Sequence, residues 1–209
     1  MIIRSRSISS SRWLREHFCD IYVKKAKKMG LRSRAWFKIH AMQKKDKLLY
    51  PGMCVIELGA SPGGWSQYIL KKIGIHGYLV ACDIISMPLL QGVDFIQGSI
   101  YNPEIVRNIL KKIQGKKVQV ILSDISPNLS GIAIVDVAKF MYLLKFLLDV
   151  FYDILCPGGR FVVKVLQGDG LEECIKNMVL LFSEIKIRKP SASRSRSREV
   201  YIVATKHSI

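Results

Sequence analysis

The chain has 209 residues, 49% of them hydrophobic, so it can bury one sizeable core and is too short for two comfortable domains. Its 33 lysines and arginines against 16 acidic residues give a formal net charge of +17, which favours a polyanion such as nucleic acid as partner. Alternatively, the positive charge reflects a Lys-rich compositional bias and the charges are merely solvated. The clustering of the charges along the sequence argues against this alternative.

The five cysteines are an odd number without a C-x-x-C pair, which is typical of reduced thiols and excludes a regular disulfide framework or zinc site. The opening MIIRSRSISSSR has no apolar core of signal-peptide length. The most apolar later stretch, 140–155, is interrupted by Lys145, Asp149 and Asp153. We therefore expect a cytoplasmic protein that binds no metal and spans no membrane.

The first 50 residues are basic, and most of them are predicted to be helical. Residues 1–11 form a Ser/Arg-rich arm without periodicity. Apolar residues at helical intervals predict a helix over 12–29 that ends at Gly30, and Ser33 is expected to cap a second helix reaching about Lys45. Basic residues interleaved with aromatic ones suit an RNA-facing surface, although a plain solvated amphipathic helix would look similar.

Strand and helix patterns alternate from residue 51 onwards, which predicts a doubly wound parallel sheet. The predicted strands are 54–58, 78–84, 93–97, 118–123 and 160–166, and the predicted helices are 65–73, 103–115, 134–155 and 169–182. Two further strands, 184–189 and 199–205, are joined by KPSASRSRSR without a helix and should form an antiparallel hairpin. We expect the basic loop 191–198 between them to contact phosphates.

The stretch VIELGASPGGW, residues 55–65, predicts a strand, a glycine turn and the start of a helix, an arrangement that binds ligands at the carboxyl edge of a parallel sheet. It matches neither the P-loop nor the dinucleotide fingerprint. Asp83 follows Gly64 by about 19 residues, close to the spacing at which a carboxylate meets ribose hydroxyls, although a helix cap or a solvated charge is the alternative. Glu57 and Asp83 would oppose a triphosphate, so a neutral or cationic nucleoside such as S-adenosylmethionine fits better.

Several segments in order resemble the FtsJ/RrmJ (RlmE) family of ribosomal RNA 2′-O-ribose methyltransferases over almost the whole chain. They are SRWLREHFCDIYVKKAKKMGLRSRAWFKI, ELGASPGGWSQY, LSDISPNLSG, FVVKVLQG and SRSREVYIVAT. The resemblance implies a Rossmann-like fold with a mostly parallel seven-stranded sheet and an antiparallel final strand. It also implies S-adenosylmethionine as methyl donor and a uridine in the A-loop of 23S rRNA as acceptor, within the 50S subunit or a late precursor.

On this resemblance the chain is one methyltransferase domain, 1–209, with a basic N-terminal part (1–50) and a Rossmann-like core (51–209), and we expect a monomer. The family's catalytic residues fall on Lys38, Asp124, Lys164 and Glu199, and its cofactor contacts fall on Gly63, Trp65, Asp83 and Asp124. Ser99 stands where the family carries an aspartate that accepts a hydrogen bond from the adenine amino group. A serine hydroxyl can accept that bond, but more weakly because it carries no charge.

Asp124 and Lys164 interrupt apolar strands, and charges are buried there only if they are paired or functional, so a structural ion pair is the alternative for each alone. We expect the carboxylates to pair mainly with Lys38, which leaves Lys164 to take the proton of the ribose 2′-hydroxyl. In a weaker version, Lys164 stays charged and only steers the oxygen.

Three other functions would also fit parts of this pattern. The first is a non-catalytic RNA-binding or ribosome-assembly factor, which the complete set of charged residues argues against. The second is a nicotinamide oxidoreductase, which the missing G-x-G-x-x-G disfavours. The third is a relative that modifies tRNA or messenger caps, from which only the resemblance distinguishes this chain.

Overall fold

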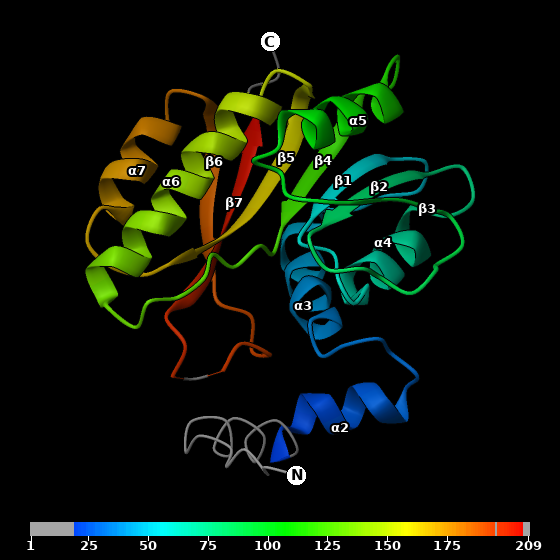
Figure 1. The fold of residues 1–209 in the computed structure, drawn as a ribbon, viewed down its shortest axis with the longest axis horizontal. Helices are drawn as coiled ribbons and strands as arrows, with labels where there is room; N and C mark the ends of the chain where they lie inside the picture. Colours follow the sequence, from blue (N-terminus) through cyan, green and yellow to red (C-terminus); the bar gives the residue numbers. More distant parts are fainter. Residues whose placement is uncertain (1–18, 195, 207–209) are drawn as a thin grey trace, which may run out of the picture.

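The protein is built around one seven-stranded sheet, seen in a computed structural model that describes residues 19–194 and 196–206 (Figure 1). The strands are β1 (Cys54–Leu58), β2 (Tyr78–Asp83), β3 (Val93–Gln97), β4 (Val118–Ser123), β5 (Leu155–Leu166), β6 (Phe182–Arg188) and β7 (Glu199–Lys206). The predicted arm 1–11 and the first part of the predicted first helix, 12–18, lie outside the described residues.

The strand order is β3-β2-β1-β4-β5-β7-β6. Strands β1 to β5 pair in parallel, and β7 runs antiparallel to both β5 and β6, which confirms the predicted terminal hairpin and the mostly parallel sheet. The direction of winding reverses between β1 and β4. In open α/β sheets ligands bind beside the carboxyl ends of the strands at such a reversal.

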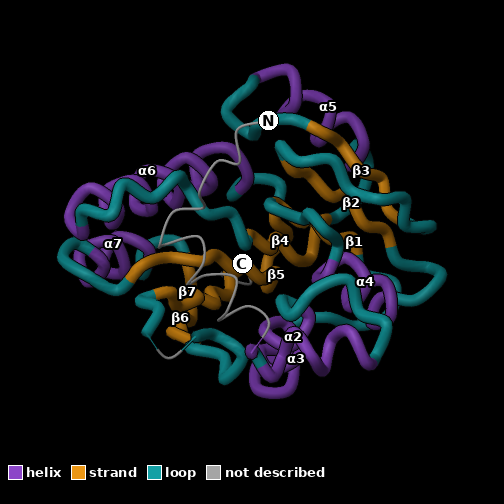
Figure 2. The backbone as a smooth tube through the Cα atoms, turned by 60° about the horizontal axis from the view of Figure 1, so that its bottom comes forward, coloured by secondary structure: helices purple, strands orange, loops and turns teal. Residues whose placement is uncertain are grey.

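Helices cover both faces of the sheet (Figure 2). They are α2 (Ile21–Lys28), α3 (Trp36–Asp46), α4 (Gly64–Ile73), α5 (Pro103–Ile113), α6 (Ala133–Phe151) and α7 (Leu171–Met178). Helices α3 and α4 lie on one face, and α5, α6 and α7 lie on the other. Within the described residues, no helix combines the length and apolarity that crossing a bilayer would require.

Alternate residues of the central strands serve the two faces, because side chains point to opposite sides along a strand. On β1, Val55 belongs to the apolar cluster that contains Trp65 and Tyr68 of α4, whereas Ile56 packs in the cluster formed with α5, α6 and α7. Both faces of the sheet are therefore covered by helices and shielded from solvent, which explains the continuous apolar runs of these strands. A charged side chain in such a strand stands out as an exception.

The element boundaries differ from the sequence prediction at two places on the far side of the sheet. Helix α6 ends at Phe151, and β5 begins at Leu155, because Leu155 is buried and pairs with Val118 ahead of a register shift in the ladder. Helix α7 ends at Met178, and Phe182 opens β6 because its ring is buried against the sheet. In both cases tertiary packing decides where the helix stops.

Two helix starts also differ. Helix α2 begins at Ile21, where the carboxylate of Asp20 accepts hydrogen bonds from the backbone N–H groups of the first turn and acts as the N-cap. Ser33 does not cap α3, which starts at Trp36. The predicted stop at Gly30 is right, since this glycine follows the C-cap with φ of 64°.

Candidate active site

Four charged side chains from four separate elements meet beside the carboxyl ends of the parallel strands. Lys38 comes from α3, Asp124 follows β4, Lys164 lies on β5 and Glu199 opens β7. Because β7 runs antiparallel to β5, its first residue lies beside the last residue of β5, and Glu199 reaches the same edge. The structure thus brings together all four residues that the sequence predicted to be catalytic.

Among these four charged side chains, Lys164 makes the shortest contacts. Its Nζ donates a hydrogen bond to the backbone oxygen of Asp124 at 2.8 Å, lies 3.2 Å from the Oδ1 atom of Asp124 and 3.9 Å from Glu199 Oε1. Nζ of Lys38 is 3.8 Å from both Asp124 Oδ1 and Glu199 Oε2. The expectation that the carboxylates pair mainly with Lys38 is therefore wrong, because Asp124 holds Lys164 more closely.

Tyr201 is the member of the group that sequence reasoning missed. Its phenol donates a hydrogen bond to Asp124 Oδ1 at 2.7 Å and accepts one from Lys38 Nζ at 3.0 Å. It is fully buried and sits directly opposite Lys164 in the β5–β7 ladder. The sequence could have indicated Tyr201, because residues two apart on a strand share a face and Tyr201 follows Glu199 by two. In the run EVYIVAT it looked like an ordinary strand aromatic.

The protonation of Asp124 and Tyr201 follows from these contacts. Burial raises the pKa of Asp124, but the charges of Lys164 and Lys38 and the hydrogen bond from Tyr201 outweigh burial and hold this pKa below its ordinary value. Burial raises the pKa of Tyr201 well above its ordinary value, and the Asp124 carboxylate beside it raises it further. At neutral pH the site thus contains an ionised Asp124 carboxylate held by a neutral phenol.

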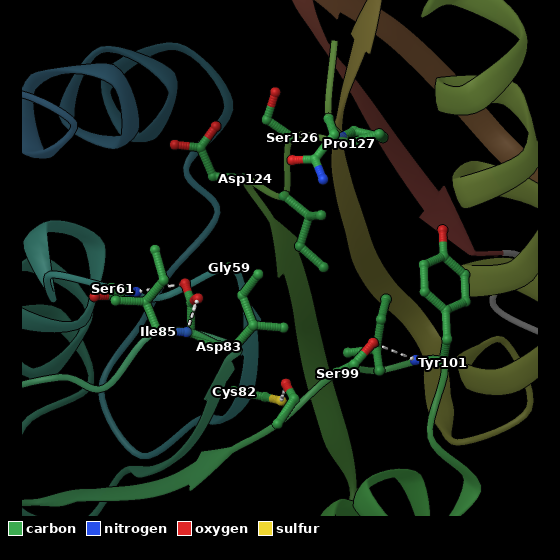
Figure 3. A pocket seen from close by; sticks show the side chains of 15 residues that line it. Gly59, Ser61, Cys82, Asp83, Ile85, Ser99, Tyr101, Asp124, Ser126 and Pro127 are labelled. Carbon is green, nitrogen blue, oxygen red and sulfur yellow. Dashed lines mark hydrogen bonds between the residues drawn. The ribbon is translucent and has the colours of Figure 1, made fainter. Parts of the chain in front are cut away.

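A cavity of about 430 Å³ opens next to this cluster, at the ends of β1, β2, β3 and β4 (Figure 3). Its lining residues are Gly59, Ser61, Cys82, Asp83, Ile84, Ile85, Gly98, Ser99, Ile100, Tyr101, Asp124, Ile125, Ser126, Pro127 and Asn128. Asp124 belongs both to the cavity wall and to the charged cluster. A ligand in the cavity would therefore lie beside Lys164 and Lys38.

Asp83 is neither a helix cap nor a solvated surface charge. Its Oδ2 accepts a hydrogen bond from the backbone N–H of Ser61 at 2.8 Å, and its Oδ1 accepts one from the N–H of Ile85 at 2.9 Å. The carboxylate thus ties the glycine turn to the end of β2 and keeps lone pairs for a ligand. Ser99, at the opposite wall in Figure 3, accepts a weak hydrogen bond from the N–H of Tyr101 at 3.3 Å.

Gly63 and Trp65 do not line this cavity in the described structure. Gly63 is the N-cap of α4 with φ of 99°, and a Cβ at this position would lie 2.9 Å from both Arg32 Nη1 and Met87 Sδ. The indole N–H of Trp65 donates a hydrogen bond to the backbone oxygen of Ala35 at 2.9 Å. Gly63 allows the tight turn before α4, and Trp65 ties α4 to the start of α3. Their role as direct cofactor contacts stays a prediction.

A model of the FtsJ-like methyltransferase family matches residues 31–207. The chain belongs to this family. The structure resembles a protein assigned as a ribosomal RNA methyltransferase from Plasmodium falciparum, at 24% identity and a TM-score of 0.75 over 84% of this chain and 98% of that one. It also resembles a protein assigned as a hemolysin from Lactococcus lactis, at 16% identity and a TM-score of 0.61 over 84% of this chain and 88% of that one. It further resembles a protein assigned as an rRNA methylase from Clostridium thermocellum, at 12% identity and a TM-score of 0.53 over 81% of this chain and 97% of that one.

In this FtsJ-like methyltransferase, Glu57 of the motif VIELGASPGGW is buried. Burial raises the pKa of Glu57 to about 8, the hydrogen bond from Ser66 Oγ at 2.6 Å opposes that shift, and the Asp124 carboxylate adds to it. Glu57 is therefore mostly neutral at pH 7, so its charge does not oppose a triphosphate as expected from the sequence. The electrostatic discrimination against a triphosphate is left to Asp83 and to the ionised Asp124, which both line the cavity.

A second cavity of about 470 Å³ lies on the other side of the charged cluster of this methyltransferase. It is lined by Arg34, Ala35, Lys38, Arg194, Arg196, Ser197 and Glu199. Lys38 and Glu199 thus belong both to this basic cavity and to the cluster around Lys164. Three arginines at its walls suit the phosphates of a nucleic acid.

Proposed function

We propose that this protein transfers a methyl group from S-adenosylmethionine to the ribose 2′-hydroxyl of a uridine in the A-loop of 23S rRNA. It acts in the cytoplasm, as a monomer, on the 50S subunit or a late precursor during maturation of the large subunit. The observation that carries this proposal is the meeting of Lys38, Asp124, Lys164 and Glu199 between two cavities. One cavity suits a nucleoside ligand and the other suits an anionic chain.

The first cavity has the donor set that an adenosine-bearing ligand requires. Asp83 would accept hydrogen bonds from ribose hydroxyls, Ser99 would accept one from the adenine amino group, and the ionised Asp124 favours a cationic ligand. No lysine or arginine lines this cavity in the described structure, which disfavours a polyphosphate. S-adenosylmethionine, when bound, supplies an electrophilic methyl group on a sulfonium.

The charged cluster would prepare the acceptor hydroxyl for this transfer. Lys164 Nζ, as a neutral amine, would receive the proton of the 2′-hydroxyl, and Asp124 holds this amine through its backbone oxygen and its carboxylate. Tyr201 donates a hydrogen bond to the same carboxylate oxygen, and Lys38 Nζ lies 3.8 Å from it, so the carboxylate that contacts Lys164 is itself held in place. Fixing the amine and the hydroxyl together removes much of the entropic cost of the reaction.

The second cavity would admit the RNA. Arg34, Arg194 and Arg196 line it, and the net charge of +17 attracts a polyanion over a longer range. Because the acceptor is a 2′-hydroxyl, an RNA with a single 2′-deoxy nucleotide at the acceptor position should bind with the same affinity and accept no methyl group.

Incorporation of a tritiated methyl group tests the proposal directly. The substrates are 50S particles that lack the modification, free 23S rRNA, tRNA and capped messenger RNA. Label in 50S particles that is lost with the 2′-deoxy acceptor supports the proposal. Label on tRNA or caps alone would assign the protein to another member of the same chemical class, and no label on any RNA would indicate a non-catalytic factor.

The pH dependence of single-turnover methyl transfer tests the role of Lys164. If Lys164 takes the proton, the rate rises with pH in the wild type, and this dependence disappears in Lys164→Arg, since a guanidinium stays protonated. If the pH profile of Lys164→Arg is the same as that of the wild type, Lys164 only steers the oxygen.

A further inference from the structure

In the chain between α2 and α3, the side chain of Arg32 contacts the loop between β2 and β3 and the glycine turn. Its guanidinium donates hydrogen bonds to the backbone oxygens of Pro88 at 2.7 Å, Leu89 at 2.6 Å and Pro62 at 3.4 Å. The first two oxygens belong to the loop between β2 and β3, and the third belongs to the glycine turn. The backbone N–H of Arg32 is also fixed, by Gln67 Oε1 of α4 at 3.2 Å.

The β2–β3 loop, residues 84–92, has few other attachments. Ile84, Ile85 and Leu89 are 67%, 62% and 93% exposed, so little apolar burial holds the loop. Apart from Arg32, the side-chain hydrogen bonds that reach its backbone come from Asp83, Ser61 and Gln97 and lie at residues 84–86. Ile84 and Ile85 form one wall of the proposed cofactor cavity. In the middle of the loop, Ser66 Oγ of α4 makes only a long contact of 3.8 Å to Met87 Sδ, so the short hydrogen bonds there come from Arg32.

The other end of the same connection reaches the basic loop 191–198. Arg34, two residues after Arg32, donates a hydrogen bond to the backbone oxygen of Ala192 and forms an ion pair with Asp20 at 3.1 Å. Tyr22 of α2 donates a hydrogen bond to Ser191 Oγ at 3.2 Å. Figure 1 shows α2 and this loop at the same end of the sheet. One short connection thus links the loop proposed to contact RNA to the wall of the cofactor cavity.

We propose that Arg32 is a positioning residue that couples RNA binding to cofactor binding. RNA on the basic surface would restrain the connection between α2 and α3, Arg32 would then hold loop 84–92, and the completed cavity wall would bind S-adenosylmethionine more tightly. By thermodynamic linkage the cofactor must strengthen RNA binding by the same factor. This inference rests on the proposed function, because it assumes that the two cavities take cofactor and RNA.

The test compares Arg32→Ala, Arg32→Lys and Lys27→Ala, a change of an exposed lysine on α2. Calorimetry with S-adenosylmethionine, with and without an A-loop RNA hairpin, gives the cofactor Kd, and hydrogen exchange reports on loop 84–92 in the protein alone. In Arg32→Ala we expect a Kd at least tenfold weaker, faster exchange in the loop and loss of the RNA effect. Arg32→Lys restores part of the affinity because an ammonium reaches one of the carbonyls. Lys27→Ala weakens RNA binding and leaves the cofactor Kd unchanged.

The proposal is overturned if Arg32→Ala weakens RNA binding alone, which would make Arg32 a phosphate contact, or if RNA leaves the cofactor Kd of the wild type unchanged. Failure of the proposed function gives different results. If its cofactor part fails, the wild type binds no S-adenosylmethionine at all, and if only its RNA part fails, the wild type binds S-adenosylmethionine but not the A-loop hairpin. In either case unchanged exchange of loop 84–92 in Arg32→Ala still refutes the positioning role.

Discussion

Replacing Glu57 by glutamine should change how the stability of the protein depends on pH. Glu57 is 1% exposed, and burial raises the pKa of its carboxyl group from 4.5 to about 8. Because the folded-state pKa is raised, its contribution to the free energy of unfolding is fully present below pH 4.5 and is lost as the pH rises towards 8. At 1.36 kcal/mol per pKa unit, the whole loss is roughly 5 kcal/mol.

Urea denaturation of the wild type and of Glu57→Gln, followed by circular dichroism from pH 5 to pH 9, measures this effect. The glutamine side chain does not titrate, so the difference between the two proteins isolates residue 57 from the other titrating groups. We expect the wild type to lose roughly 3.5 kcal/mol relative to the variant between pH 5 and pH 8, and less than about 0.5 kcal/mol more above pH 8. A difference that stays constant with pH, or one that shifts in favour of the wild type, would refute the reasoning.

Three further substitutions test other parts of the site and fold. Tyr201→Phe removes the hydrogen bond to the Asp124 carboxylate, worth about 1.5–3 kcal/mol, and should lower kcat by about 10- to 100-fold with little change in the KM for the cofactor; an unchanged kcat would show that the phenol does not hold the carboxylate in place. Ser99→Asp should tighten the cofactor Kd by about tenfold, measured by calorimetry, because a carboxylate accepts a stronger hydrogen bond; an unchanged Kd would place the adenine elsewhere. Asp46→Asn removes the carboxylate that forms a bidentate ion pair with Arg188, whose side chain is 25% exposed. We expect the free energy of unfolding, measured by urea denaturation, to fall by about 2–3 kcal/mol. A loss below about 0.5 kcal/mol would mean that solvent replaces the ion pair.

The sequence predicted the centre of the sheet well and its far side less well. Strands β1, β3 and β4 have the predicted bounds because each is a short apolar run between turn residues. The start of β5 was missed because Leu155 continues the apolar pattern of α6, and only its pairing with Val118 shows that the chain has left the helix. Short apolar runs next to a helix carry no local signal that separates the two states.

At the site, the sequence indicated which residues gather but not how they pair. Lys164 and Asp124 stood out because charges in apolar strands need partners. Their pairing depends on how close α3 comes to the sheet edge, which leaves Lys38 3.8 Å from Asp124, and on the β5–β7 register, which puts Tyr201 opposite Lys164. The burial of Glu57, which makes it a neutral acid, is likewise a tertiary property, because the motif alone does not show which way its side chain points.

The methylated nucleotide in ribosomes gives the most direct test of the central claim. Mass spectrometry and primer extension would compare 23S rRNA from cells with this protein, cells without it, and cells that carry only Lys164→Ala. The proposed function predicts one 2′-O-methyl group, on a uridine of the A-loop, that is present with the wild-type protein and absent in the other two. A 23S rRNA with the same modifications in all three, or a lost methyl group that had been on a base, would contradict it.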